Sequence, residues 1–186
     1  MNNKNFLFIH IPKTGGTAIA KALSLGKTTH STQDQLIKKL EADPSTHFIF
    51  TFCRNPWDRF LSLYFYCVRG SETYNSNDIE KYINFETFCK LCAKKTKIVT
   101  RIVWQVHYLP QLHFINEKNI NYIGRFENLQ QDFDIICKKL DLPGQLLHKK
   151  NTTNHRHYTE YYNNNTKDIV YKMYKEDINY FKYEFG

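Results

Sequence analysis

The chain has 186 residues, of which 41% are hydrophobic and 16% aromatic. That composition suits one folded domain spanning residues 1–186 and excludes a disordered chain. Lysine and arginine outnumber acidic residues to give a net charge of +8, which favours an anionic partner without selecting one. No stretch approaches the roughly 18 apolar residues of a membrane helix, so we expect no integral membrane segment.

The cysteines indicate the redox compartment. There are five, an odd number, at irregular spacing. This pattern is typical of free thiols in a reducing compartment, so we expect a cytoplasmic protein. Cys89 and Cys92 form a lone CxxC, and without a second pair at ligand spacing the sequence predicts no metal site.

Strand-like and helix-like patterns alternate along the chain. We predict strands at 6–11, 47–53 and 121–124, and helices at 17–25, 33–41, 57–66, 85–94, 129–140 and 168–180. Two segments, 70–78 and 148–157, have the composition of exposed loops. Strands that alternate with helices over short connections predict an α/β fold with a parallel sheet. Ligands of such folds bind at the carboxyl ends of the strands.

The first strand runs directly into the segment HIPKTGGT, residues 10–17. Gly15 and Gly16 let the backbone approach an anion closely, and the N–H groups at the start of the following helix attract negative charge. Lys13 adds a full positive charge, and Thr14 and Thr17 add hydroxyl groups. The segment therefore resembles a phosphate cradle, although the Walker pattern GxxxxGK[ST] is absent.

The second strand ends in a comparable junction, RNPWDRFLSLY, residues 54–64. Arg54 follows the strand as a planar fork suited to a phosphate. Pro56 fits the first turn of a helix, where its missing N–H has no cost. Ser62 lies about two turns further along that helix.

Together, these two junctions resemble the sulfotransferase family that includes carbohydrate and heparan sulfate 2-O-sulfotransferases. The segment YIGRFENLQQDF (residues 122–133) and the tyrosine-rich end of the chain are similar to the same family. The resemblance implies a P-loop-like three-layer fold with a central parallel sheet flanked by helices. It also implies the donor 3′-phosphoadenylyl sulfate (PAPS) and no metal.

The resemblance further implies a role for individual residues in binding this donor. Its 5′-phosphosulfate loop corresponds to Lys13, Thr14, Gly15, Gly16 and Thr17, and Lys13 is placed to neutralise charge on the leaving oxygen. The residues of the family that bind the 3′-phosphate of the donor correspond to Arg54 and Ser62. Arg125 corresponds to a segment that lies close to the nucleotide in the family. Lys149 and Lys150 correspond to a loop that covers the donor.

Transfer to a hydroxyl also requires a base, and histidine suits this role near neutral pH. His30 lies between the first junction and the second strand, where the related 2-O-sulfotransferases place a histidine base, so we predict it as the base. His107 is the second choice. We expect His107 and Gln111 to bind the acceptor, a saccharide or glycan.

Two other functions stay open at this point. One is a nucleotide or small-molecule kinase with a variant phosphate loop, which is disfavoured because no Walker lysine and no acidic metal ligand at a strand end are evident. The other is a non-enzymatic module that binds a polyanion. The lysine pairs are scattered along the chain rather than gathered on one helix, so we expect no nucleic acid partner. The sequence selects neither the acceptor nor an oligomeric state.

Overall fold

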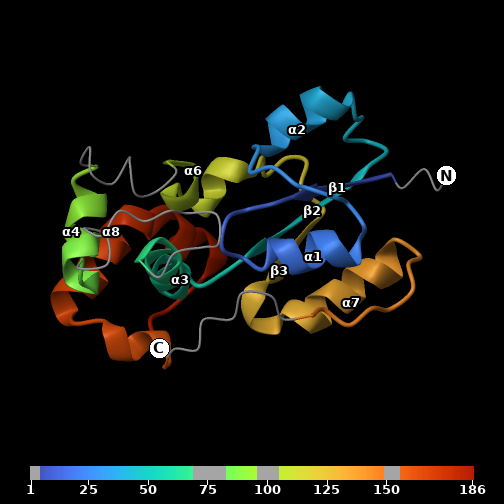
Figure 1. Ribbon diagram of the computed structural model, residues 1–186. Coiled ribbons are helices and arrows are strands. Elements are labelled where there is room, and N and C mark those ends of the chain that lie inside the picture. Colours follow the sequence, from blue (N-terminus) through green and yellow to red (C-terminus); the bar gives the residue numbers. More distant parts are fainter. Residues whose placement is uncertain (1–4, 69–82, 96–104, 149–155) are drawn as a thin grey trace. The chain divides into compact units, whose positions relative to one another are not determined.

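The computed structural model describes residues 5–68, 83–95, 105–148 and 156–186 (Figure 1). They form two compact units, one made of Met1–Arg54 with Gln111–Asn151 and the other of Asn55–Pro110 with Thr152–Gly186. The fold class is α/β, as predicted, with a parallel sheet flanked by helices. The single domain stays a prediction. The predicted loop at 70–78 and most of the one at 148–157 lie outside the described residues.

The first unit is built on a sheet of three parallel strands, β1 (Phe6–Ile9), β2 (Phe48–Cys53) and β3 (Tyr122–Arg125), with β2 in the centre. Every residue of β1 is buried, and all but the first of β2. Strands that are covered on both faces consist of nearly continuous apolar residues, which explains the pattern seen in the sequence.

Helices cover both faces of this sheet (Figure 1). α1 (Gly16–Ala22) and α7 (Leu129–Lys139) lie on one face, and α2 (Gln33–Leu40) lies on the other. Side chains two residues apart on the strands point to the same face. On the α1 and α7 face they form a buried cluster that includes Phe6, Phe8, Phe50, Phe52, Ile19, Phe133 and Ile136.

Several boundaries differ from those predicted. β1 ends at Ile9, two residues early, because the chain leaves the sheet to form the following loop. α1 ends at Ala22 rather than residue 25, because Ser24 takes a left-handed φ of 54° that breaks the helix. The helix α6 (Gln105–Tyr108) and the three short 3₁₀ segments among the described residues were not predicted.

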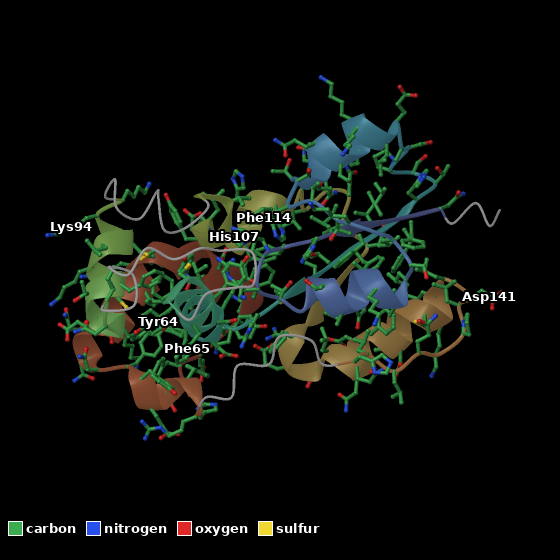
Figure 2. All side chains as sticks on the ribbon, viewed as in Figure 1. Tyr64, Phe65, Lys94, His107, Phe114 and Asp141 are labelled. Carbon is green, nitrogen blue, oxygen red and sulfur yellow. The ribbon has the colours of Figure 1, made fainter. Side chains whose placement is uncertain are left out.

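The second unit is helical in its described part. It contains α6, α3 (Pro56–Val68), α4 (Phe85–Ala93) and α8 (Asn164–Phe181), and α8 packs against both α3 and α4. Aromatic rings fill the core between these helices (Figure 2). Closely packed ring pairs include Phe60 with Phe88 and Tyr64 with Phe88, both at 5.4 Å between centroids.

Asn55 joins the start of α3 to the end of the chain. Its Oδ1 accepts from the Trp57 N–H at 3.1 Å, which caps the helix. Its Nδ2 donates to the Tyr158 hydroxyl at 3.2 Å and to the Glu184 carbonyl at 2.9 Å. Within the RNPWDR segment, Asn55 and Pro56 therefore have structural roles.

All five cysteines are buried, and none is joined in a disulfide. Burial raises the pKa of Cys89 to about 12 and moves the pKa of Cys92 well above its ordinary value, so both thiols stay protonated near neutral pH. Within the described ranges, no three His, Cys, Asp or Glu side chains are grouped as metal ligands. None of the helices in those ranges is both long enough and apolar enough to span a bilayer.

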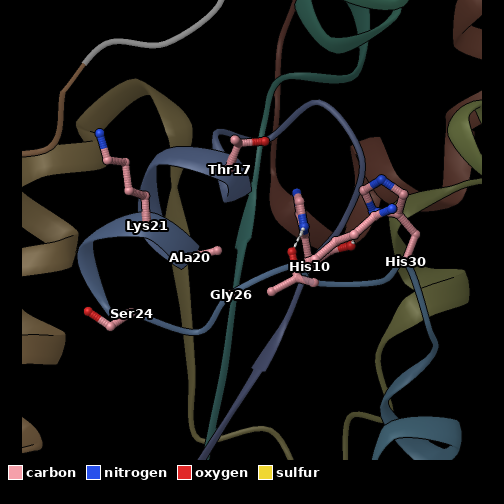
Figure 3. Close-up of a pocket in the computed structure, with 9 residues that line it drawn as sticks. His10, Thr17, Ala20, Lys21, Ser24, Gly26 and His30 are labelled. Carbon is pink, nitrogen blue, oxygen red and sulfur yellow. Dashed lines mark hydrogen bonds between the residues drawn. The ribbon is translucent and has the colours of Figure 1, made fainter. Parts of the chain in front are cut away.

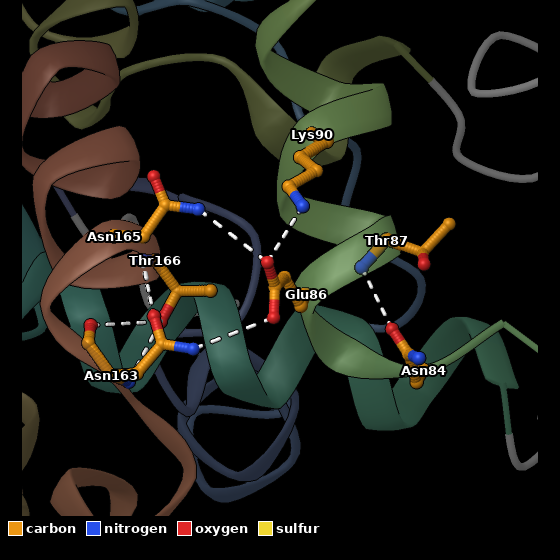
Figure 4. A network of polar contacts seen from close by, with 7 residues as sticks. All are labelled: Asn84, Glu86, Thr87, Lys90, Asn163, Asn165 and Thr166. Carbon is orange, nitrogen blue, oxygen red and sulfur yellow. Dashed lines mark hydrogen bonds and ion pairs between the residues drawn. The ribbon is translucent and has the colours of Figure 1, made fainter.

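Asparagine side chains cap α4 and α8 (Figure 4). Asn163 Oδ1 accepts from the Thr166 N–H at 2.9 Å, and the Thr166 hydroxyl oxygen accepts from the Asn163 N–H at 3.0 Å. This reciprocal cap starts α8 at Asn164, four residues before the predicted start.

Replacing Asn163 with alanine should lower the free energy of unfolding by about 1 kcal/mol, because the first turn of α8 loses its cap. Urea denaturation would measure the change. Asn165→Ala is the matched control, since Asn165 reaches only the exposed Glu86 carboxylate at 3.5 Å. Its effect should stay within about 0.5 kcal/mol, and equal losses in the two variants would contradict the capping role.

Candidate active site

The loop between β1 and α1 has a tightly bent backbone. Lys13 and Gly15 both take left-handed φ values, 69° and 83°. Glycine adopts this conformation freely, whereas lysine does so only when its surroundings hold it there. The Thr14 hydroxyl donates to the Ile11 carbonyl at 2.9 Å and is buried, so this donor is committed to the loop itself. Thr17, by contrast, is exposed.

Gly16 begins α1, and the ring of His10 packs directly against it. A Cβ atom added at Gly16 would lie 2.0 Å from His10 Cδ2, so no side chain fits there while His10 keeps its place. His10 is itself buried. Its Nδ1 forms a 2.6 Å hydrogen bond with the Thr28 hydroxyl, and its ring stacks on Phe8. The shape of the loop therefore depends on the histidine that directly follows β1.

Arg54 lies close to this loop. Its Nη1 donates to the Lys13 carbonyl at 3.2 Å, and its guanidinium lies 4.0 Å over the ring of Phe126. The structure thus brings together Lys13 and Arg54, which are 41 residues apart in the chain. Both follow the carboxyl ends of parallel strands, where the sequence predicted a ligand.

Arg125 adds a third basic residue at the same edge of the sheet. It is the last residue of β3 and lies opposite Cys53, the residue before Arg54. Its N–H donates to Asp132 Oδ2 at 2.6 Å, which fixes its backbone. Lys13, Arg54 and Arg125 therefore place basic residues at or just beyond the carboxyl ends of all three strands.

His30 is held by the main chain of His10, just before the loop. Its Nδ1 is 2.9 Å from the His10 carbonyl oxygen, and because a carbonyl only accepts, Nδ1 carries the proton. In the neutral ring the lone pair is then on Nε2. Burial lowers the pKa of His30 from its ordinary 6.5, the hydrogen bond to His10 opposes that shift, and the charge of Lys13 adds to it. His30 is therefore neutral near pH 7 and able to accept a proton.

A hollow of about 500 Å³ lies beside the loop, between α1 and the segment that leads to His30 (Figure 3). The rings of His10 and His30 meet edge to face on one side of it, with centroids 4.5 Å apart. Its polar lining was not predicted, because hydroxyl groups and lysines in a short loop have no distinctive pattern. The other lining residues are Thr17, Ala20, Lys21, Ser24, Gly26, Lys27 and Thr28.

The remaining candidates lie elsewhere. Gln111, expected to contact the acceptor, is instead fully buried, with both ends of its amide bonded to the Arg54 main chain. Ser62 lies on α3 and His107 on α6, both in the second unit, where His107 stacks on Tyr66. Lys149 and Lys150 lie outside the described residues.

Comparisons with known proteins agree with the sequence resemblance. An uncharacterized protein of Archaeoglobus fulgidus is 27% identical over 106 residues, which make up 57% of this chain and 78% of that protein. No solved structure matches the chain at a significant level. The model of the sulfotransferase family matches residues 2–184, almost the full length. This chain therefore belongs to the sulfotransferase family, whose members transfer sulfuryl groups.

Proposed function

We propose that the protein transfers the sulfuryl group of PAPS to a hydroxyl of a saccharide or glycan and releases adenosine 3′,5′-bisphosphate. Membership of the family supports sulfuryl transfer in general. The observation that carries the choice of donor is the hydrogen bond from Arg54 to the Lys13 carbonyl. It joins the two segments that resemble the 5′-phosphosulfate loop and the 3′-phosphate site of the family.

The donor set at this edge of the sheet suits such a nucleotide. Ammonium, guanidinium, backbone N–H and hydroxyl groups all donate to phosphate and sulfate oxygens. The loop residues Lys13 to Thr17 would bind the 5′-phosphosulfate, with Arg54 and Ser62 on the 3′-phosphate and Arg125 nearby. Lys149 and Lys150 are proposed to cover the donor, by resemblance alone. The proposal includes no metal, since side-chain cations supply the positive charge.

When bound, PAPS supplies an activated sulfuryl group whose leaving group departs as an anion. Lys13 would neutralise the charge that develops on the leaving oxygen, and loop N–H groups would bind the transferring group. The Nε2 atom of His30 would accept the proton of the acceptor hydroxyl. Catalysis of this kind depends mainly on positioning and electrostatics, which suits a loop of fixed shape.

We place the acceptor in the hollow beside the loop. Its lining includes the hydroxyls of Thr17, Ser24 and Thr28, which pair well with a polyhydroxylated molecule. The ring of His30 is part of the same lining, so an acceptor hydroxyl there would lie near the proposed base. His107 is kept as a proposed acceptor contact.

A transfer assay tests this function. The protein should move radiolabelled sulfate from PAPS to members of a saccharide panel and should transfer no phosphate from radiolabelled ATP. Adenosine 3′,5′-bisphosphate should form in equal amount to the sulfated product. Phosphate transfer from ATP, with none of sulfate from PAPS, would overturn the proposal in favour of a kinase.

Lys13→Ala should lower kcat more than it weakens PAPS binding, because the contact with the leaving oxygen strengthens as charge develops. Alanine and lysine adopt the left-handed φ of 69° at position 13 at a similar energetic cost, so the substitution should leave the backbone unchanged. Steady-state kinetics with varied PAPS would measure both constants, with the exposed Lys118→Ala as control. A raised KM for PAPS with an unchanged kcat would make Lys13 a binding residue only.

His30→Ala should lower kcat by roughly 10²–10⁴-fold, the usual contribution of a general base. Because the pKa of His30 is lowered from 6.5, the wild-type rate should fall on acidification only below about pH 6.5, as Nε2 becomes protonated. The variant should lose this acidic limb of its pH–rate profile. His113→Ala, at an exposed histidine, should keep it. A full acidic limb in His30→Ala would assign the base to another residue.

A further inference from the structure

The main chain of Arg54 is held by one buried side chain, that of Gln111. Gln111 Oε1 accepts from the Arg54 N–H at 2.9 Å, and Gln111 Nε2 donates to the Arg54 carbonyl at 2.9 Å. Only this orientation of the amide pairs each donor with an acceptor. Arg54 stands one residue beyond the end of β2, so Gln111 fixes the backbone just where the strand ends.

The side chain of Arg54 is held as well. It donates to the Lys13 carbonyl and lies over the face of Phe126, and the residue is only 8% exposed. Stacking of a guanidinium on an aromatic ring is attractive and limits its rotation. A side chain ordered in advance loses less conformational freedom when it binds an anion.

Phe126 also lies against the loop. A Cβ added at Gly15 would be 3.3 Å from Phe126 Cδ2, so the ring packs close to the loop as well as under Arg54. Lys13, whose carbonyl Arg54 binds, is the residue with the left-handed φ of 69°. The bend of the loop and the orientation of Arg54 therefore share the same supports.

We propose that Gln111 and Phe126 are positioning residues of the donor site, which hold Arg54 so that the loop and the 3′-phosphate contact form one preorganised unit. The 3′-phosphate part rests on the function proposed above. Gln111 acts through the Arg54 backbone, and Phe126 acts through the guanidinium and the loop. Neither needs to touch the donor.

Two measurements separate positioning from simple stabilisation. Calorimetry gives the affinities for adenosine 3′,5′-bisphosphate and for AMP, and their ratio is the 3′-phosphate preference. Hydrogen–deuterium exchange of the peptide covering residues 10–17, in the protein without nucleotide, reports on the loop directly. Substitution of a residue that only stabilises the fold would change neither the 3′-phosphate preference nor the loop exchange rate, once the rate is corrected for global unfolding.

The variants are Gln111→Leu and Phe126→Leu, with two controls. Gln130→Leu makes the same chemical change at an amide that also bonds main-chain groups, the Gln145 carbonyl at 2.9 Å and the Leu147 N–H at 2.8 Å, but not Arg54. Phe126→Tyr retains the aromatic face. Phe126 is only half-buried, so its pair of variants serves even if Gln111→Leu does not fold.

Gln111→Leu and Phe126→Leu should each lower the 3′-phosphate preference about tenfold, as expected for one well-placed polar contact, and should speed exchange in the loop. Phe126→Tyr and Gln130→Leu should leave both values at the wild-type level. Wild-type loop exchange and wild-type preference in both leucine variants would overturn the proposal. Equal affinity of the wild-type protein for the two nucleotides would overturn the proposed donor instead, and the exchange result alone would then decide whether the two residues position the loop.

Discussion

The parallel pairing of three strands is the constraint on which the site depends. Because β1, β2 and β3 run in the same direction, the segments that follow them all leave the sheet at one edge. Lys13, Arg54 and Arg125 come from distant parts of the chain, yet each lies at or just after the carboxyl end of one of these strands. An antiparallel partner in place of β2 would carry Arg54 to the opposite edge, away from the loop.

This concentration of positive charge also affects the histidine beside it. Burial is the main cause of the lowered pKa of His30, because it disfavours the protonated ring. The hydrogen bond to the His10 carbonyl opposes this shift, and the ammonium of Lys13 lowers the pKa further. Lys13, which would attract an anionic donor, thus also helps keep His30 in the form that accepts a proton. A positive charge that binds an anion is therefore compatible with a neutral histidine that acts as a base. The His10 carbonyl holds the His30 ring in the tautomer that has its lone pair on Nε2.

Much of the fold and part of the site could be predicted because the relevant signals are local. The loop of Lys13 and the position of Arg54 are each encoded by a short segment at a strand end, and the family match bears out the resemblance that those segments carry. The roles of Gln111 and Phe126 had no such signal, since they depend on contacts across 57 and 72 residues of sequence. The glutamine side chain was therefore interpreted as an acceptor contact, although its amide is occupied by the Arg54 backbone. The binding and catalytic roles of all the candidate residues, Ser62 and His107 included, stay predictions.

The close packing of His10 on Gly16 has an evolutionary consequence. A side chain can enter at position 16 only if the residue at position 10 becomes smaller, and a smaller residue at position 10 would release Thr28 and leave a gap against Phe8. Substitutions at the two positions are therefore not independent. Across a set of related chains, a histidine at the first position should occur with glycine at the second, and lineages that lose the glycine should also have lost the histidine.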